Sequence, residues 1–477
     1  MIAPDWLPLF VEATFFLCVG YSLLLFLFVL GMLVFSTAES RYRAKKKTFE
    51  DYDALAGSPY AIPVSIIAPA HNEEVMVLPA VRSLLQQHYP EFEVILVDDA
   101  STDETLPLLK REYDLQAQES FHRNIVPSDP SGALVYRSRT EPRLVVVSKS
   151  KSGGNKADAM NAGINVARYR YFCFVDGDTV YVPDALMNAM TEVAKDPAHI
   201  VGATSLFGNS REPETQNASA DGRRIVDRHL LSNFQHLDLM RSFIGYRLAW
   251  SRLGFMLCNP GAFAIWRRDV IAEVGGFSKA FSCEDIEMTF RVHEKLRREK
   301  RPYRILALPD LVAHTEGPDS VSSLVRQRAR WQKVTLETVW HYRRMLLRPS
   351  YGSVGMVGAP YFVLFEALAP LIQALSFVSL SFAIWFDLLD WTSYLALLGI
   401  VVFAGAIPTT ATLWMHDAAY RDYRFKDLLR MLAIGPLDLF LYRPIVMYAG
   451  LRGTWQFLRN DRGWDKFERN VRQAKPG

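Results

Sequence analysis

Residues Tyr171–Asp178 of this 477-residue chain read YFCFVDGD, and the fold can be worked out from this stretch. Five consecutive apolar residues are typical of a strand buried on both faces, as in a parallel sheet. The polar turn Asp176-Gly177-Asp178 follows at once. Two carboxylates on one tight turn can hold Mg²⁺ or Mn²⁺ and leave positions open for phosphate oxygens. The alternative is a solvated acidic turn.

Three earlier apolar runs have the same form, each closed by a polar loop: Val64–Ala68, Val94–Val97 and Leu144–Val147. Helical stretches between them predict a mostly parallel sheet with right-handed crossovers. Ligands of such sheets gather at the carboxyl ends of the strands. The segment from about 60 to 330 is therefore expected to be a soluble α/β domain, with irregular insertions near 118–142 and 207–221.

The loops after these strands carry acidic groups, glycines and a lysine. Asp98-Asp99 suits a base or ribose edge, or else a helix N-cap with an acidic first turn. Gly153–Lys156 places a flexible backbone and a cation beside a helix start, which suits phosphate. It lacks the spacing of a nucleotide triphosphatase loop. If the sheet is parallel, these loops and Ala70–Glu73 converge on one crevice.

Three later motifs each have two interpretations. Asp285 in Cys283-Glu284-Asp285 is a helix cap or a general base for an acceptor hydroxyl. The segment Gln327–Trp331 (QRARW) is an interfacial anchor or a set that binds sugar and diphosphate. The segment Asn259–Phe263 is a wall near the acceptor or a plain turn before a strand.

Composition limits the class of protein. Lys plus Arg is 54 and Asp plus Glu is 51, a net charge of +3, which argues against a nucleic-acid partner. The four cysteines have no metal-ligand spacing, so neither a disulfide scaffold nor a zinc site is expected. A hydrophobic share of 50% with mean hydropathy +0.03 indicates a soluble catalytic part joined to membrane segments.

The N-terminal segment Ala13–Ala38 has no charged residue and exceeds the about 20 residues that a bilayer requires. It has no basic region before it, so it is not a signal peptide. The basic cluster Arg41–Lys47 follows it. The positive-inside rule then predicts an outside N-terminus and a cytosolic catalytic domain.

The C-terminal third is apolar again. Segment 353–386 is expected to be interfacial up to Leu368 and to span after Pro370, and Trp391–Met415 is a second charge-free span. Segment 431–451 contains Asp438 and Arg443, which are costly in lipid, and a basic tail follows. It is expected to be re-entrant or interfacial, with the tail in the cytosol.

In this order the motifs resemble those of the membrane-integrated, processive members of glycosyltransferase family 2. That group includes the bacterial cellulose, hyaluronan, chitin and poly-N-acetylglucosamine synthases. The resemblance covers about Ile62–Trp331 and the membrane layout. It implies a GT-A fold, a UDP-sugar donor, Mg²⁺ or Mn²⁺, and inversion at the anomeric carbon.

The resemblance also assigns roles to residues. Asp285 is the base, and Asp176 and Asp178 hold the metal. The nucleotide sugar is bound by Ala70, Glu73, Asp99 and Asp176. Lys156 is added to this set from its own position beside a helix start, which suits a phosphate. The acceptor and diphosphate are bound by Glu284, Gln327, Arg330 and Trp331.

Two departures from the family pattern stand out. The base motif reads Cys-Glu-Asp where Thr-Glu-Asp is common, which leaves Asp285 in its role. No soluble regulatory domain follows the membrane part, so a cyclic-dinucleotide switch within this chain is not expected. Apart from these two departures, the tail Gly463–Lys466 is only loosely similar to the Trp-containing gating loop of hyaluronan synthases.

The expected layout runs as follows: an N-terminal membrane helix at 1–40, a basic linker at 41–60, a GT-A domain at 61–331, interfacial helices at 332–368, two membrane helices at 369–415, and an interfacial or re-entrant helix with a basic tail at 416–477. The expected partners are a UDP-sugar, a glycan acceptor and the plasma-membrane bilayer. A homodimer or a separate export protein is left open, because three spans are few for a polymer channel. Two other functions stay open: transfer of one sugar to a polyprenyl phosphate, and a transporter or scaffold with an inactive domain.

Overall fold

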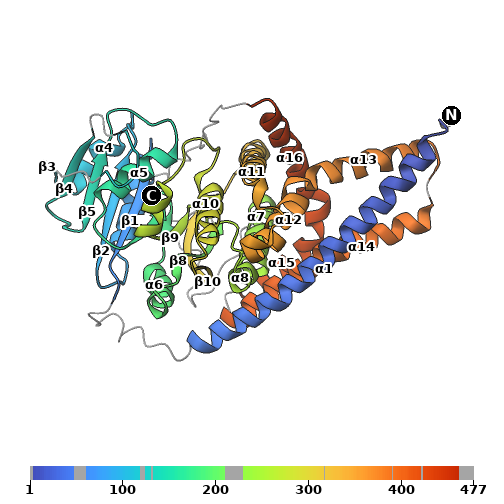
Figure 1. Cartoon of the computed structure of the whole chain (residues 1–477), viewed down its shortest axis with the longest axis horizontal. Coiled ribbons are helices and arrows are strands. Elements are labelled where there is room, and N and C mark those ends of the chain that lie inside the picture. Colours follow the sequence, from blue (N-terminus) through green and yellow to red (C-terminus); the bar gives the residue numbers. More distant parts are fainter. Residues whose placement is uncertain are drawn as a thin grey trace.

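A mixed sheet organises the middle of the chain in the computed structural model (Figure 1). The structure describes residues 4–47, 61–118, 124–129, 133–209, 229–315, 317–388, 390–420 and 423–460. In this part of the chain ten strands follow the order β3-β4-β5-β2-β1-β6-β9-β8-β10-β7. Their bounds are β1 Val64–Ala70, β2 Phe92–Asp98, β3 Leu115–Gln118, β4 Leu134–Ser138, β5 Leu144–Ser148, β6 Tyr171–Val175, β7 Val180–Tyr181, β8 Ile200–Asn209, β9 Phe263–Arg267 and β10 Arg304–Thr315.

The four strands expected from the sequence form the parallel centre of this sheet. β5, β2, β1 and β6 are adjacent and parallel, with Ala70 opposite Asp98 and Asp98 opposite Ser148. The polar loops that follow these strands therefore share one edge, as predicted. The flanks differ from the mostly parallel expectation, because β4 and β9 pair antiparallel with their neighbours. β4 also lies inside a stretch that was expected to be irregular.

Helices cover both faces of the sheet. Successive side chains of a strand point to opposite faces, so each strand packs against both helical layers. Ile66 points to the layer of α3, α4 and α6, whereas Ile67 points to the layer of α5, α9 and α10. Both residues are buried. The helices of this part are α3 Val77–Leu85, α4 Thr105–Glu112, α5 Lys156–Val166, α6 Ala185–Lys195, α7 Leu230–Met240, η1 Arg241–Arg247, α8 Leu248–Leu253, α9 Arg268–Val274, α10 Glu284–Arg298 and α11 Val321–His341.

The remaining helices are apolar or connect apolar ones. Helix α11 continues past the domain boundary expected at residue 331. The others are α1 Leu7–Lys47, η2 Arg343–Met345, η3 Pro349–Tyr351, η4 Val354–Gly358, α12 Ala359–Tyr361, η5 Phe362–Ala367, α13 Ala369–Trp385, α14 Trp391–Tyr420, α15 Phe425–Ile434, η6 Gly435–Leu437, η7 Asp438–Tyr442 and α16 Arg443–Leu458.

Three helical segments of the described chain are long and apolar enough to cross a membrane: Leu7–Lys46, Trp391–Ala418 and Phe425–Leu458. A fourth candidate is the pair Val354–Ala367 and Ala369–Trp385, bent by 41° where the sequence predicted a break. The expected spans at 13–38 and 391–415 fall inside α1 and α14. Segment 425–458 passes the same test of length and composition, so its expected interfacial position stays a prediction.

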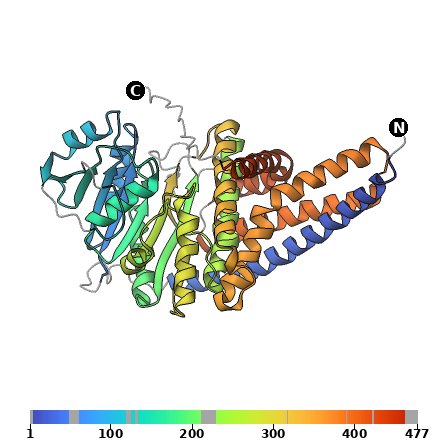
Figure 2. The same ribbon diagram turned by 45° about the horizontal axis from the view of Figure 1, so that its top comes forward.

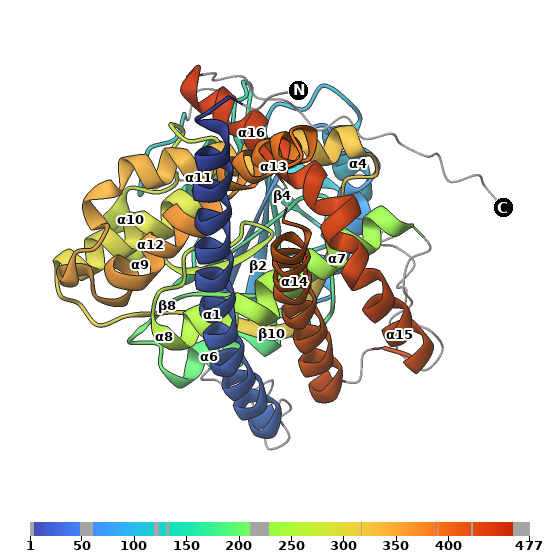
Figure 3. The same cartoon turned by 90° about the vertical axis from the view of Figure 1, so that its right-hand side faces the viewer.

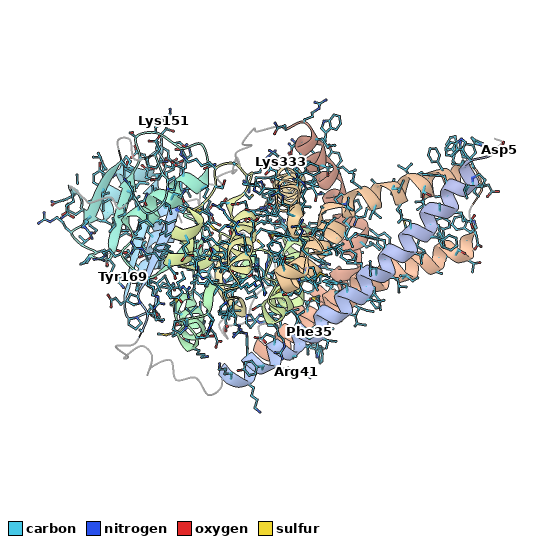
Figure 4. All side chains as sticks on the ribbon, in the orientation of Figure 1. Asp5, Phe35, Arg41, Lys151, Tyr169 and Lys333 are labelled. Carbon is cyan, nitrogen blue, oxygen red and sulfur yellow. The ribbon has the colours of Figure 1, made fainter. Side chains whose placement is uncertain are left out.

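Helices α1, α13 and α14 extend together away from the sheet (Figure 2). At their far end, Leu7, Val11 and Ala383 are buried against one another. Asp5 lies at this end, whereas Lys151 lies at the opposite end of the molecule (Figure 4). α16 packs against α11 and α13 (Figure 3). In Figure 1 it lies between the sheet and the far end of these helices.

Candidate active site

The turn between Asp176 and Asp178 is packed directly against the end of β1. A Cβ at Gly177 would lie 2.5 Å from the carbonyl oxygen of Pro69, so only glycine fits there. The Asp176 amide donates to the Tyr181 hydroxyl at 3.0 Å, and that hydroxyl donates to the carbonyl of Ala262 at 2.7 Å. The carboxylate turn is therefore fixed by close packing on Pro69 and by Tyr181, which is itself bonded to Ala262. It lies next to the predicted nucleotide loop.

Lys156 brings three of the predicted motifs together. It is the first residue of α5, and Asn155 caps this helix by accepting from the Asp158 amide. The Lys156 ammonium lies 2.5 Å from Asp176 Oδ1 and 3.6 Å from Glu284 Oε1. It also donates to the carbonyl of Gly261 at 3.4 Å. The glycine-rich loop, the carboxylate turn and the base motif thus converge on one cation.

Negative charge is crowded at this point. Burial raises the pKa of the Asp176 carboxyl; Lys156 opposes this shift, and Asp178 and Glu284 add to it. Burial alone would lower the pKa of Lys156, but Asp176 and Glu284 outweigh it and raise that pKa. Carboxylates that repel one another favour the binding of a cation.

The residues fit a divalent metal that shares its coordination with a substrate. Asp176 and Asp178 offer carboxylate oxygens on a single turn. Among the residues that the structure describes, no group of three or more His, Cys, Asp or Glu side chains could hold a metal. Mg²⁺ is commonly bound by one or two carboxylates together with substrate phosphates and water. A diphosphate would supply the missing ligands here.

Asp285 lies in the first turn of α10, where the helix dipole stabilises an anion. The N-cap is Cys283, so Asp285 itself does not cap the helix. Its Oδ2 lies 3.5 Å from the Gly261 amide and 3.9 Å from Cys258 Sγ. Gly261 therefore contacts both Lys156 and Asp285, which brings segment 259–263 into the site.

Helix α11 is bonded to the segment that precedes Asp285. The four cysteines are free thiols, and burial raises the pKa of Cys283 to about 12. The charge of Arg330 opposes this rise in the pKa, whereas Asp285 and Glu284 add to it. Ser282 also donates its backbone N–H and its hydroxyl to Glu337 of α11, both at 2.9 Å.

The predicted nucleotide loop is fixed to the neighbouring strand end. The carbonyl of Ala70 accepts from the Asp99 amide at 2.9 Å. The Glu73 amide donates to Thr105 Oγ1 at 2.8 Å. Asn72 has φ 56°, a left-handed conformation that asparagine tolerates better than most residues. Ala70 and Glu73 thus border the same edge as the carboxylate turn.

Both carboxylate oxygens of Asp99 already accept hydrogen bonds from other side chains of the protein. Lys149 Nζ lies 2.5 Å from Asp99 Oδ1 and 2.6 Å from Asp158 Oδ2, and Ser152 donates to Asp99 Oδ2 at 2.6 Å. Asp99 therefore holds the loop that leads to Lys156, and its role in nucleotide binding stays a prediction. Lys149 was not among the residues predicted from the sequence. Its position directly after β5, opposite an acidic strand end, was the available signal.

Gln327 and Trp331 lie on α11 within a turn of Arg330. The Trp331 side chain is 36% exposed, so part of its ring is accessible. The Arg328 guanidinium lies over this ring at 4.4 Å from the centroid. No role was predicted for Arg328, because a single arginine in a basic helix has no local sequence signal. The tail 463–466 is outside the described residues.

The α/β sheet, with paired carboxylates, a lysine and an acidic helix start gathered at one edge, has the arrangement of a glycosyltransferase of the GT-A type. The chain belongs to glycosyltransferase family 2. The profile described as glycosyl transferase family 2 matches residues 65–275, and that of glycosyl transferase family group 2 matches residues 171–407. The expected fold class and enzyme class are confirmed.

Curated relatives include polysaccharide synthases. The chain is 24% identical over 343 residues to the poly-beta-1,6-N-acetyl-D-glucosamine synthase of Staphylococcus aureus strain COL, which covers 71% of this chain and 68% of the relative. It is 25% identical over 282 residues to the synthase of the same name from Staphylococcus epidermidis, covering 58% and 56%. The chain is thus a family 2 enzyme related to polysaccharide synthases.

The fold is also similar to that of a solved structure. A mannosyltransferase from Pyrobaculum calidifontis, in complex with GDP-Man and Mn²⁺, matches with a TM-score of 0.56 and 17% identity. The match covers 95% of this chain and 99% of that one. At this identity the likeness supports the GT-A fold and its attached helices, and no more.

Proposed function

We propose that this protein is a membrane-bound, inverting polysaccharide synthase that transfers a sugar from a UDP-sugar to a growing β-linked glycan. The convergence of Lys156, Asp176 and Glu284 at 2.5 and 3.6 Å carries this proposal. The glycine-rich loop, the carboxylate turn and the base motif come from distant parts of the chain. Their meeting at one strand edge supports a working transferase over an inactive scaffold.

In the proposed reaction each residue acts on a defined part of the substrates. Asp176 and Asp178 would hold Mg²⁺ or Mn²⁺, which when bound neutralises charge on the departing nucleotide diphosphate. Lys156 and Arg330 add positive charge around the same group. Asp285 takes the proton of the acceptor hydroxyl, whose oxygen attacks the anomeric carbon from the side opposite the diphosphate. An α-linked donor gives a β-linked product.

A screen of radiolabelled nucleotide sugars tests the proposal. The purified protein in lipid is incubated with each UDP-sugar, and with GDP-mannose, in the presence of Mg²⁺ or Mn²⁺. Release of UDP together with a labelled product that grows with time supports the proposed function. Release of GDP alone would overturn the choice of donor, and failure with every donor would support a scaffold.

Trp331 tests whether transfer is repeated on the same glycan. An exposed aromatic face holds a sugar ring weakly and without fixed direction, so the glycan can slide after each addition. We expect Trp331→Ala to lose polymer while slow donor hydrolysis remains, and Trp331→Phe to keep part of the activity, as measured by product sizing. Full-length polymer from Trp331→Ala would overturn the acceptor role of Trp331. A wild-type product that carries one sugar on a polyprenyl phosphate would favour the second candidate, single transfer to that lipid.

The proposed topology places the N-terminus outside, with the catalytic domain and the C-terminus in the cytosol. The buried contacts of Leu7, Val11 and Ala383 support an outer tip far from the sheet. Asp438 forms ion pairs with Arg241 at 2.8 Å and Arg443 at 3.1 Å, which supports docking of segment 425–458 on the cytosolic domain. We expect a reporter fused after Gly477 to be cytosolic. An external signal would mean that 425–458 crosses the membrane.

A further inference from the structure

A largely buried cluster of charged residues joins the sheet domain to the C-terminal apolar segment. It consists of Asp238 of α7, Arg241 of η1, Arg328 of α11, Asp438 of η7 and Arg443 of α16. Asp238 contacts three guanidinium groups: Arg328 at 2.8 Å, Arg241 at 3.1 Å and Arg443 at 3.3 Å. Burial by itself would raise the pKa of Asp238, but the attraction of the three guanidinium groups outweighs it and holds the pKa well below the ordinary value.

Arg328 connects this cluster to Trp331. One of its amino groups lies 2.8 Å from Asp238 Oδ2, and the other donates to the Tyr442 hydroxyl at 2.9 Å. The centre of the guanidinium lies 4.4 Å from the Trp331 ring centroid. Asp238 and Tyr442 thus hold the Arg328 guanidinium over the indole ring. Ordering a long side chain costs entropy, so such fixing would be lost without its partners.

The backbone around Trp331 is fixed from the same side. A Cβ at Gly453 of α16 would lie 2.3 Å from the carbonyl oxygen of Ala329, so α16 approaches α11 as closely as glycine allows. The side-chain amide of Gln332 donates to the carbonyl of Ala367 at 2.9 Å. The turn of α11 that carries Trp331 therefore has a fixed position, and what remains to be set is the orientation of its ring.

We propose that Asp238, acting through Arg328, is a positioning residue that holds the Trp331 ring in the orientation that binds the acceptor sugar. The role of Trp331 rests on the proposed function. Without the Asp238 carboxylate, Arg328 and Arg443 lose a shared counter-ion and repel each other. Arg328 then leaves the ring, and the indole turns among several rotamers.

Two variants test this proposal against a matched control. Asp238→Asn removes the charge, and Arg328→Lys keeps the charge but removes the planar group that stacks on the ring. The control, Glu93→Gln, removes a buried carboxylate near the start of β2, far along the chain from the charged cluster. Glu93 contacts Arg168 at 2.8 Å. A role in folding alone would make the control behave like the two variants. Asp238→Glu is expected to restore part of the wild-type behaviour.

The first measurement separates acceptor binding from donor binding. We expect Asp238→Asn and Arg328→Lys to raise the KM for an acceptor oligosaccharide by about five- to tenfold, in line with the loss of a cation–π contact. The KM for the donor should stay within about twofold, because these residues do not contact the donor site. Product chains should be shorter. An unchanged acceptor KM in either variant would overturn the proposal.

The second measurement does not depend on activity. Protein labelled with 5-fluorotryptophan gives a ¹⁹F resonance for Trp331, which Trp331→Phe identifies. We expect this resonance to shift or broaden in Asp238→Asn and Arg328→Lys, and not in Glu93→Gln. An unchanged resonance overturns the positioning role even if the enzyme is active. A shifted resonance in a protein that transfers no sugar supports the coupling and overturns the proposed function instead. If Asp238→Asn does not fold, Arg328→Lys decides.

Discussion

Replacing Asp285 by asparagine is expected to lower kcat by about 10²–10⁴-fold, the usual contribution of a general base. The Asp285 carboxylate lies 3.5 Å from the Gly261 amide in the first turn of α10, beside Lys156 and Glu284. Asparagine keeps the size of the side chain but cannot take a proton from the acceptor hydroxyl. The KM for the donor should change little, because the base acts on the acceptor.

The measurement is initial-rate kinetics with donor and acceptor varied separately, together with binding of UDP by calorimetry. Asp269→Asn is a matched control, because Asp269 is also an acid in the first turn of a helix but lies at the start of α9. We expect this control to be nearly wild type. If Asp285→Asn loses donor affinity and keeps its turnover number, Asp285 is not the base.

The second large effect concerns the metal. Asp178→Asn removes one of the two carboxylates of the turn. Loss of a residue that only supports a metal ligand lowers activity by about 10- to 100-fold, and loss of a ligand itself should lower turnover further. The apparent affinity for Mn²⁺ should fall with it. In the wild-type protein, excess EDTA should abolish transfer, and Mg²⁺ or Mn²⁺ should restore it.

Asp184→Asn is the control for this variant, because Asp184 is a nearby carboxylate whose side chain is 64% exposed and contacts His88. Titration of activity against Mn²⁺ in the three proteins separates loss of a ligand from loss of folding. Wild-type turnover in Asp178→Asn, or full activity in EDTA, would contradict the metal assignment.

Much of this site could be predicted because its signals are local. Apolar runs such as Tyr171–Val175 must be buried, and in a parallel sheet the residue after each strand lies at one edge. Asp176 and Asp178 were therefore found from position alone. The order of the motifs along the chain then identified the family, which the sequence profiles confirm.

The flanks of the sheet could not be predicted in this way. β4 is only five residues long and ends in the polar residues Arg137 and Ser138, so its sequence resembles a loop until β5 supplies a partner. Segment 425–458 was ambiguous for a different reason. The cost of Asp438 and Arg443 in lipid depends on whether counter-charges are present, and those counter-charges, Arg241 and Asp238, come from a distant part of the chain.

The sequence by itself determined the central strands, the apolar helices and the chemical groups at the strand ends, because each depends on periodicity within a few residues. Tertiary structure alone decided which of these groups touch. Lys156 contacts Asp176 and Glu284, and Lys149 forms an ion pair with Asp99. Asp238 contacts Arg328, which lies over the Trp331 ring. Packing of the helices on the sheet and on one another brings these groups together. Contacts between residues far apart in the chain leave no periodic signal in it.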